Sequence, residues 1–241
     1  MFFFDSLSLT VFVVSLILSG GAQLLVSRAY RKYREVPASS GLTGAQAAER
    51  MLRANGVAGI GIEPVDGMLS DHYDPTHKVL RLSPDVYAGR SLAALGIACH
   101  EAGHALQHAR GYTPLFLRTA MVPVAAFGTN MGYFFMLIGL MLGAASGVPG
   151  IGRTIAMIGF GTFLVAVLFS IVTLPVEFDA SRRAKRQLVE LGFLSGPGET
   201  SGVASVLNAA ALTYVAAAIT SLLLLVEWAI RLGLLGGRSE E

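Results

Sequence analysis

Charged residues are scarce in this sequence of 241 residues, at 14% of the chain. Soluble domains carry about 25%. Hydrophobic residues instead make up 53%, and glycine occurs 28 times. This balance excludes an ordinary soluble globule and is typical of a protein that crosses a membrane several times. The formal net charge of +2 is too small to indicate a nucleic-acid partner.

Cysteine is almost absent, because Cys99 is the single one. An intrachain disulfide is therefore excluded, and the redox compartment is left open. The N-terminal stretch MFFFDSLSLT also lacks the basic residues that open a cleavable signal peptide. We expect the first apolar segment to be retained in the protein.

Long apolar runs are what the chain does have. Four of them are about 20 residues long, which is enough to cross a bilayer as a helix. They predict a mainly α membrane protein with four transmembrane helices, at residues 7–26, 119–142, 154–174 and 209–230. The second and third spans together form the segment 119–174, and the short loop GVPGIGR, residues 147–153, joins them.

Basic residues are concentrated in the two polar stretches between the spans. Residues 28–118 and 175–208 together hold 15 of the 18 lysines and arginines. Four spans place these stretches on one side of the membrane, and the positive-inside rule makes that side cytoplasmic. We therefore expect both termini outside, together with the loop that contains Arg153.

The stretch 28–118 has the pattern of a small α+β region. Thr43 is a candidate N-cap for one helix, and Asn55-Gly56 is its stop. Three β-prone runs follow, and the turn at residues 74–77 predicts a β-hairpin between the last two. Ser91 is then expected to cap a second helix, which Gly111 ends.

Within the other polar stretch, 175–208, the segment PVEFDASRRAKRQLVEL predicts a helix that has Pro175 in its first turn and ends at Gly192. In the second span, the pairs Gly128–Gly132 and Gly139–Gly143 predict close packing on a neighbouring helix. Asn130 is expected to bond across helices, and Trp228 suits the membrane interface.

The stretch CHEAGHALQH, residues 99–108, places His100 and His104 four positions apart. On a helix, this spacing puts both imidazoles on one face, where they can reach one ion at about 2.0–2.1 Å. Glu101 can face a water on that ion without being a ligand. Zinc lowers the pKa of such a water to about 7, and the glutamate takes its proton. The alternative is two hydrogen-bonded, inert histidines, but Ala102 and Gly103 leave room for an ion.

Glu177, in LPVEFDAS, is the candidate third ligand. A catalytic zinc site needs three protein ligands, and two histidines with a glutamate are a known set. Two membrane crossings separate Glu177 from His104 and return the chain to its starting side. Ser181 shares the helical face of Glu177 and could support the ligands, whereas Asp179 is expected to interact with the helix dipole.

The remaining histidines and the cysteine are not predicted as ligands. His108 continues the four-residue spacing, but it lies about 6 Å further along the helix axis than His104. His72 and His77 belong to the hairpin and are interpreted as surface residues. Cys99 is interpreted as a small, packed hydrophobic residue.

Four segments carry a resemblance to a known family. DHYDPTHKVLRLS, IACHEAGHALQHA, TLPVEFDASRRA and LNAAALTYVAAA resemble the YugP-like family of bacterial membrane-bound neutral zinc metallopeptidases, over most of the chain. The resemblance implies zinc on His100 and His104, Glu101 as the general base, and an acidic motif at Glu177. EFDAS is also similar to the E-F-x-A-D ligand helix of the prenyl-protein and heat-shock membrane peptidases, with Ser181 in place of the final acid.

These observations predict an integral-membrane zinc-dependent metalloendopeptidase of the bacterial plasma membrane, with its active site close to the cytoplasmic surface. Its substrates would be peptides or proteins, including membrane proteins. Lys78–Ser83 or Gly67–Tyr73 could be an edge strand that pairs with an extended substrate, and Tyr73 or Tyr87 could stabilise the oxyanion.

Three other functions fit the sequence less well. A zinc-binding scaffold without catalysis is the alternative, although an intact Glu101 argues against it. Cleavage inside the bilayer is disfavoured because only a short apolar run precedes His100. A transporter is disfavoured because the spans contain almost no ionisable residues.

Overall fold

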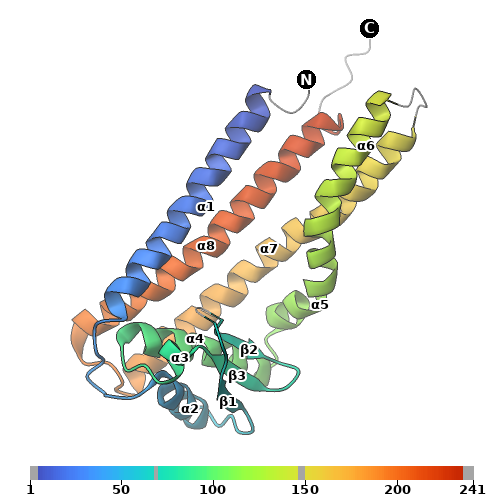
Figure 1. Ribbon diagram of the computed structural model, residues 1–241. Coiled ribbons are helices and arrows are strands. Elements are labelled where there is room, and N and C mark those ends of the chain that lie inside the picture. Colours follow the sequence, from blue (N-terminus) through green and yellow to red (C-terminus); the bar gives the residue numbers. More distant parts are fainter. Residues whose placement is uncertain (1–4, 68–69, 146–149, 236–241) are drawn as a thin grey trace. The chain divides into compact units, whose positions relative to one another are not determined.

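The computed structural model describes residues 5–67, 70–145 and 150–235 (Figure 1). It is mainly helical, with one small sheet. The helices are α1 (Ser6–Tyr33), α2 (Gly44–Ala54), α3 (Pro84–Tyr87), α4 (Leu92–Ala109), α5 (Thr113–Phe127), the π-helix η1 (Gly128–Gly132), α6 (Tyr133–Ala145), α7 (Ile151–Glu190) and α8 (Gly196–Arg231). The strands are β1 (Gly61–Pro64), β2 (His72–Asp74) and β3 (Val79–Leu82).

The chain divides into two compact units. Unit 1 comprises Met1–Gly21, Leu117–Thr173 and Tyr214–Glu241, and unit 2 comprises Ala22–Phe116 and Leu174–Thr213. Helices α1, α5, α7 and α8 contribute to both units. The sheet, α2, α3 and α4 belong to unit 2.

Four helical segments of the described chain are long and apolar enough to span a membrane. Each contains one predicted span: Ser6–Tyr33, Thr113–Gly143, Ile151–Glu190 and Gly196–Arg231. The expected mainly α fold with four such helices is therefore confirmed. Residues 147–149 of the predicted loop 147–153 lie outside the described chain.

One helix boundary was predicted wrongly. Residues 175–190 do not form a separate helix, because α7 continues from Ile151 through Pro175 to Glu190. A proline inside a helix removes one backbone hydrogen bond, and a long, well-packed helix tolerates that loss with a bend. The predicted C-terminal end of this helix is confirmed, because α7 ends at Glu190 and Gly192 follows it with a left-handed φ of 68°. The last helix also begins earlier than the predicted span, at Gly196.

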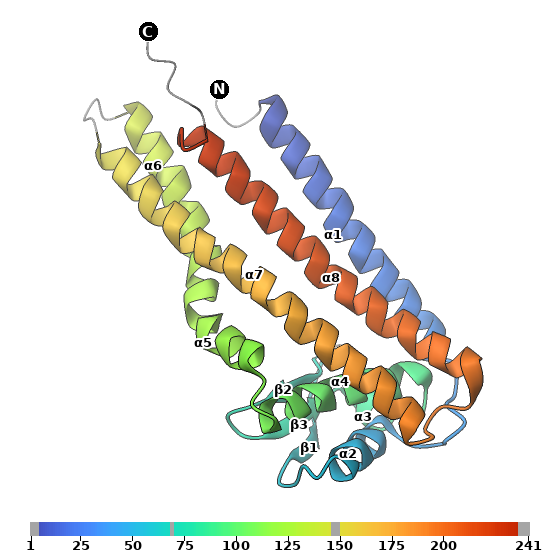
Figure 2. The ribbon, with the colours of Figure 1, turned by 180° about the vertical axis from the view of Figure 1, so that it is seen from behind.

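Unit 1 is held together by close helix packing, which Figure 2 shows where α6 lies beside the first part of α7. A Cβ on Gly139 would stand 2.4 Å from the Ala156 nitrogen, and one on Gly128 would stand 2.2 Å from the Thr162 carbonyl oxygen. The predicted role of these glycines is confirmed. At Gly143 no described atom lies within 4 Å of the Cβ it would carry, but its backbone nitrogen lies 2.4 Å from the Cβ that Gly152 of α7 would carry.

The contacts of Asn130 differ from the prediction, and Trp228 lies buried in unit 1. The Asn130 side chain donates to the Ala126 carbonyl of its own segment, at 2.8 Å, rather than across helices. Trp228 is 3% exposed and packs in a cluster with Met136, Phe163 and Val167. Its ring meets that of Tyr133 edge to face.

Unit 2 contains a three-stranded sheet of order β1-β3-β2. β2 and β3 pair antiparallel, with Tyr73 opposite Leu80, which confirms the predicted hairpin. β1 pairs with β3 in parallel. Lys78–Ser83 was therefore wrong as an edge strand, because β3 lies at the centre of the sheet. The other candidate, Gly67–Tyr73, overlaps β2 but includes residues 68–69, which lie outside the described chain.

Helix caps define the starts of helices α2 and α4 in unit 2. Thr43 and Gln46 form a reciprocal capping box at the start of α2, and Asn55 caps its end. The Ser91 hydroxyl accepts from the Ala94 N–H and starts α4, as predicted. α4 lies across the sheet and packs against α2 (Figure 1), and its apolar residues form the centre of the unit 2 core.

Candidate metal centre

Helix α4 and helix α7 meet where α4 carries its histidines. Gly103 makes this contact possible, because a Cβ there would stand 2.8 Å from the Ala180 carbonyl oxygen of α7. Ala180 is fully buried. The glycine between the two histidines therefore allows the α7 backbone to approach α4, and this approach brings Glu177 and Ser181 to the histidine face.

Three side chains converge at this contact. His100, His104 and Glu177 each offer one ligand atom, and these atoms lie within 4.8 Å of one another. The Oε2 atom of Glu177 is 3.1 Å from His100 Nε2 and 3.6 Å from His104 Nε2. Tetrahedral zinc with bonds of about 2.0–2.2 Å holds its ligand atoms about 3.3–3.6 Å apart. The two distances from Glu177 bracket this range, and the whole set lies within 4.8 Å, so small side-chain movements would let it hold one zinc ion.

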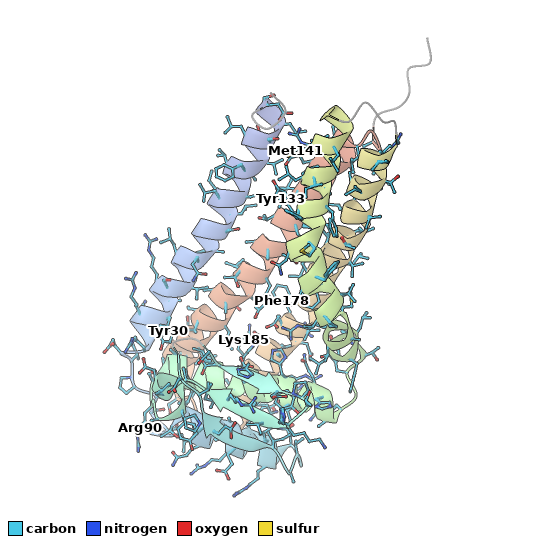
Figure 3. The ribbon with its side chains drawn as sticks, turned by 45° about the vertical axis from the view of Figure 1, so that its right-hand side comes forward. Tyr30, Arg90, Tyr133, Met141, Phe178 and Lys185 are labelled. Carbon is cyan, nitrogen blue, oxygen red and sulfur yellow. The ribbon has the colours of Figure 1, made fainter. Side chains whose placement is uncertain are left out.

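Burial makes this cluster unlike a surface ion pair. The side chains of His100, His104 and Glu177 are 13%, 8% and 2% exposed. A buried carboxylate is costly unless it is paired or binds a metal. Phe178, the next residue along α7, is exposed and lies on another face of the helix (Figure 3). Glu177 is therefore buried because it lies on the face of α7 that packs against α4, while some neighbouring residues of α7 are exposed.

Glu101 lies on α4 beside His100 and is partly buried. Burial raises the pKa of its carboxyl group, and the charges of Glu177 and Asp71 raise it further, whereas His100 and His104 act to lower it. A carboxyl group with a raised pKa beside a metal-ligand set can accept and return a proton. This is the chemistry that the sequence predicts for Glu101.

The outer ring nitrogen of each histidine has its own partner. His100 Nδ1 is 3.0 Å from the Ser181 hydroxyl, a contact that agrees with the supporting position predicted for Ser181. His104 Nδ1 is 3.0 Å from Oε1 of Gln107, which is fully buried. Sequence reasoning missed Gln107. The available signal was a polar residue three positions after His104, on the same face of an otherwise apolar helix.

Asp179 has a different role from the predicted one. Because α7 is continuous, Asp179 is in the middle of a helix and does not face the dipole of a first turn. Its Oδ2 accepts from Gln107 Nε2 at 2.9 Å and from Arg183 Nε at 2.6 Å. Asp179 of α7 is therefore connected to His104 of α4 through Gln107.

The other histidines and Cys99 stay outside the donor cluster. His108 Nδ1 is 2.8 Å from the Tyr73 hydroxyl, which links α4 to strand β2. His72 and His77 are exposed, and each bonds within the hairpin. Cys99 is fully buried in the core cluster, as a packed hydrophobic residue would be.

Comparison with known proteins places the chain in a family. A family described as "Putative neutral zinc metallopeptidase" matches residues 8–233. The chain belongs to this family. It is 46% identical, over 230 residues, to a protein of Bacillus subtilis (strain 168) named "Putative membrane protease YugP". The match covers 95% of this chain and 96% of that protein. No solved structure matches the chain.

Membership in this zinc metallopeptidase family agrees with the buried cluster of unit 2. The family description names zinc, and the cluster provides a ligand set of a kind that zinc accepts. The name of the relative refers to a membrane, and four helices of this chain are apolar enough to cross one. The resemblance that the sequence motifs indicated is confirmed.

Proposed function

We propose that this protein is an integral-membrane zinc metalloendopeptidase whose active site is the cluster on α4 and α7. The observation that carries the proposal is the convergence of His100, His104 and Glu177 within 4.8 Å, with Glu101 beside them on α4. A structural zinc site is closed by four protein ligands, whereas a catalytic site has three and an open position. The three-residue set, in a chain of a zinc metallopeptidase family, favours catalysis.

Zinc held by these residues would supply Lewis acidity and an activated water for attack on the scissile carbonyl. His100 and His104 would hold the ion through Nε2, and the Glu177 carboxylate would offset part of its charge. Glu101 would take the proton of the attacking water and return it to the leaving amine. Ser181 and Gln107 would keep the two imidazole rings in place through Nδ1.

The active site is proposed to face the cytoplasm, close to the membrane. The two stretches that contain the site residues carry 15 of the 18 lysines and arginines, which supports a cytoplasmic side. Glu177 follows the predicted end of the third span, Leu174, by three residues. Peptide bonds of membrane proteins and of flexible segments near the surface would then be within reach.

Strand β2 is the proposed docking edge for an extended substrate. The N–H groups of Gly61 and Val65 donate to β3, so by alternation the backbone of Pro64 faces away from β3 and offers no N–H. The outer edge of β1 is therefore a poor template. β2 forms the opposite edge of the sheet among the described residues, and it packs against α4. A substrate strand beside β2 would lie along the helix that carries Glu101.

The proposal is tested by zinc analysis and cleavage of a fluorogenic peptide library with purified protein. Glu101→Gln should retain zinc and lose activity about 100-fold to 10,000-fold, the usual contribution of a general base. Glu177→Ala should lose most of its zinc. Glu190→Ala, on the exposed end of α7, is the matched control and should retain both.

Two results would contradict this function. Full cleavage by Glu101→Gln would remove the general-base role, and one tightly bound zinc per chain in Glu177→Ala would remove the ligand assignment. Zinc binding by the wild type without cleavage of any peptide would favour a zinc-binding scaffold.

Orientation is tested separately by cysteine labelling, since the native Cys99 is buried. Ile151→Cys, at the exposed start of α7, should react with an impermeant maleimide on intact cells. Val189→Cys, exposed near the other end of α7, should react only after lysis. The reverse pattern would place the metal centre outside.

A further inference from the structure

The buried Gln107 side chain makes three hydrogen bonds beside the candidate metal centre, to His104, Val176 and Asp179. We propose that Gln107, oriented by Val176 and Asp179 of α7, is a positioning residue that sets the tautomer of His104 for metal binding. The inference rests on the proposed function, in that it assigns His104 Nε2 to the metal.

The first step is the orientation of the Gln107 amide. Its Nε2 donates to the Val176 carbonyl at 2.8 Å and to the Asp179 carboxylate at 2.9 Å. Both partners only accept hydrogen bonds. A flipped amide would place its oxygen against two other oxygens, in a site where Gln107 is fully buried. The amide nitrogen therefore faces α7, and Oε1 faces His104.

The second step fixes the proton on His104. Because Oε1 of Gln107 can only accept, His104 Nδ1, 3.0 Å away, must be the donor. A neutral imidazole with its proton on Nδ1 has its lone pair on Nε2. Nε2 is the atom that lies 3.6 Å from Glu177 Oε2, on the side of the cluster. The orientation of one amide thus directs the free lone pair of His104 toward the ligand set.

His100 lacks an equivalent constraint. Its Nδ1 is 3.0 Å from the Ser181 hydroxyl, which can donate or accept. Ser181 is therefore compatible with either tautomer of His100. The structure assigns tautomer control to one of the two histidines, and this asymmetry distinguishes the role of Gln107 from general support.

Asp179 acts on His104 only through Gln107. Its Oδ2 also accepts from Arg183 Nε at 2.6 Å, and the Arg183 guanidinium lies 5.9 Å from the centre of the Tyr112 ring. These contacts hold the carboxylate in place. Val176 and Asp179 flank Glu177 on α7, so the segment that provides the third ligand also orients the amide.

The test uses Gln107→Met, which keeps the side-chain volume and removes the hydrogen bonds. Gln187→Met is the matched control, because Gln187 is also buried and its amide also bonds across helices, to Asn55, without contacting a ligand. Zinc affinity is measured by competition with a chelator. In zinc-free protein at alkaline pH, ¹⁵N NMR identifies which ring nitrogen of His104 carries the proton.

Wild type and Gln187→Met should show the proton on Nδ1 of His104. Gln107→Met should show a mixture of tautomers and bind zinc about 10-fold to 100-fold more weakly, the usual effect of losing a ligand-orienting group. Asp179→Asn should weaken zinc binding less, because its amide can present either oxygen or nitrogen to Gln107. It should have little further effect in the Gln107→Met background.

Unchanged zinc affinity and an unchanged tautomer in Gln107→Met would overturn the inference. Equal loss of affinity in Gln187→Met would do the same, since it would indicate general destabilisation. If Gln107→Met does not fold, the tautomer of His104 in Asp179→Asn tests the inference instead. A mixture of tautomers is the expected result, and a proton on Nδ1 alone would contradict the inference. Absence of zinc from the wild type would refute the proposed function, whereas the zinc-free NMR comparison would still decide the role of Gln107.

Discussion

Polar side chains form different kinds of bonds in the two units of this protein. In unit 1, most of them donate to carbonyls of their own helix, as Thr129, Asn130 and Thr162 do. In unit 2, Gln107, Ser181 and Gln187 bond between helices that are far apart in the sequence. A polar group satisfied within its helix does not specify a neighbour, whereas one that bonds between helices does. Hydrogen bonds therefore specify the packing of unit 2 far more than that of unit 1.

Unit 1 has exceptions. The hydroxyls of Ser170 and Ser221 lie 3.0 Å apart and link α7 to α8, and a larger cluster links α1 to α8. Arg231 bonds to Asp5 and Glu227, and the Ser8 hydroxyl donates to Glu227 at 2.6 Å. Close glycine contacts bring η1 and α6 against α7. The difference leads to four predictions, from the largest expected effect to the smallest.

Zinc should stabilise unit 2 selectively. A ligand present at 1,000 times its dissociation constant stabilises the folded state by about 4 kcal/mol. Removal of zinc with a chelator should therefore speed amide exchange in α4 and in the part of α7 after Thr173, and leave α6 unchanged. Hydrogen-exchange mass spectrometry in detergent measures each helix. Equal loosening of α6 would show that the units do not respond separately.

Gly103→Ala should destabilise unit 2 at the contact between α4 and α7. The new Cβ would meet the Ala180 backbone, which cannot move aside as a side chain could. We expect a loss of about 1–3 kcal/mol in the free energy of unfolding, as for other overpacked sites, together with weaker zinc binding. Thermal unfolding and chelator competition measure the two effects.

The matched control for Gly103 is Gly198→Ala in α8. No described atom lies within 4 Å of the Cβ that this substitution adds. It should be neutral or stabilise the protein by up to about 1 kcal/mol, because alanine favours the helix. Loss of stability in both variants would show that close packing at Gly103 is not the cause.

Gly139→Ala should separate stability from metal binding. Its Cβ would stand 2.4 Å from the Ala156 nitrogen in unit 1, so we expect a loss of about 1–3 kcal/mol. Zinc affinity should not change, because the donor cluster belongs to unit 2. Gly161→Ala, with no described atom within 4 Å of the added Cβ, serves as the control. A lower zinc affinity in Gly139→Ala would contradict the separation.

The smallest effect is expected at Asn130. Asn130→Leu removes a bond to the residue's own helical segment at an exposed position, and the free energy of unfolding should change by less than about 0.5 kcal/mol. Gln187→Leu in unit 2 removes buried bonds to Asn55 and Glu190 and should cost about 1–3 kcal/mol. Equal losses in the two variants would refute the contrast between the units.

Much of this structure could be predicted from local sequence signals. Thr43 and Ser91 cap the helices that they precede, and the turn after Asp74 joins two paired strands. The approach of His100, His104 and Glu177 agrees with the spacing of the histidines and with the return of the chain to its starting side. These features depend on neighbouring residues or on charge counts, which the sequence displays directly.

The features that were missed depend on long-range packing. Pro175 can begin a helix or bend one, and only the continuity of α7 decides between them. The position of β3 at the centre of the sheet follows from its parallel pairing with β1, which a hairpin pattern does not reveal. Gln107 acquires its role from Val176 and Asp179, about 70 positions later in the chain.

The distance in sequence between the two halves of the metal centre has a consequence during biosynthesis. Glu177 is made 73 residues after His104, so the proposed ligand set cannot assemble on a nascent chain until α7 has left the ribosome. By then, three of the four candidate spans have been synthesised. If the proposed function is right, the protein is latent as a peptidase through most of its own translation and membrane insertion.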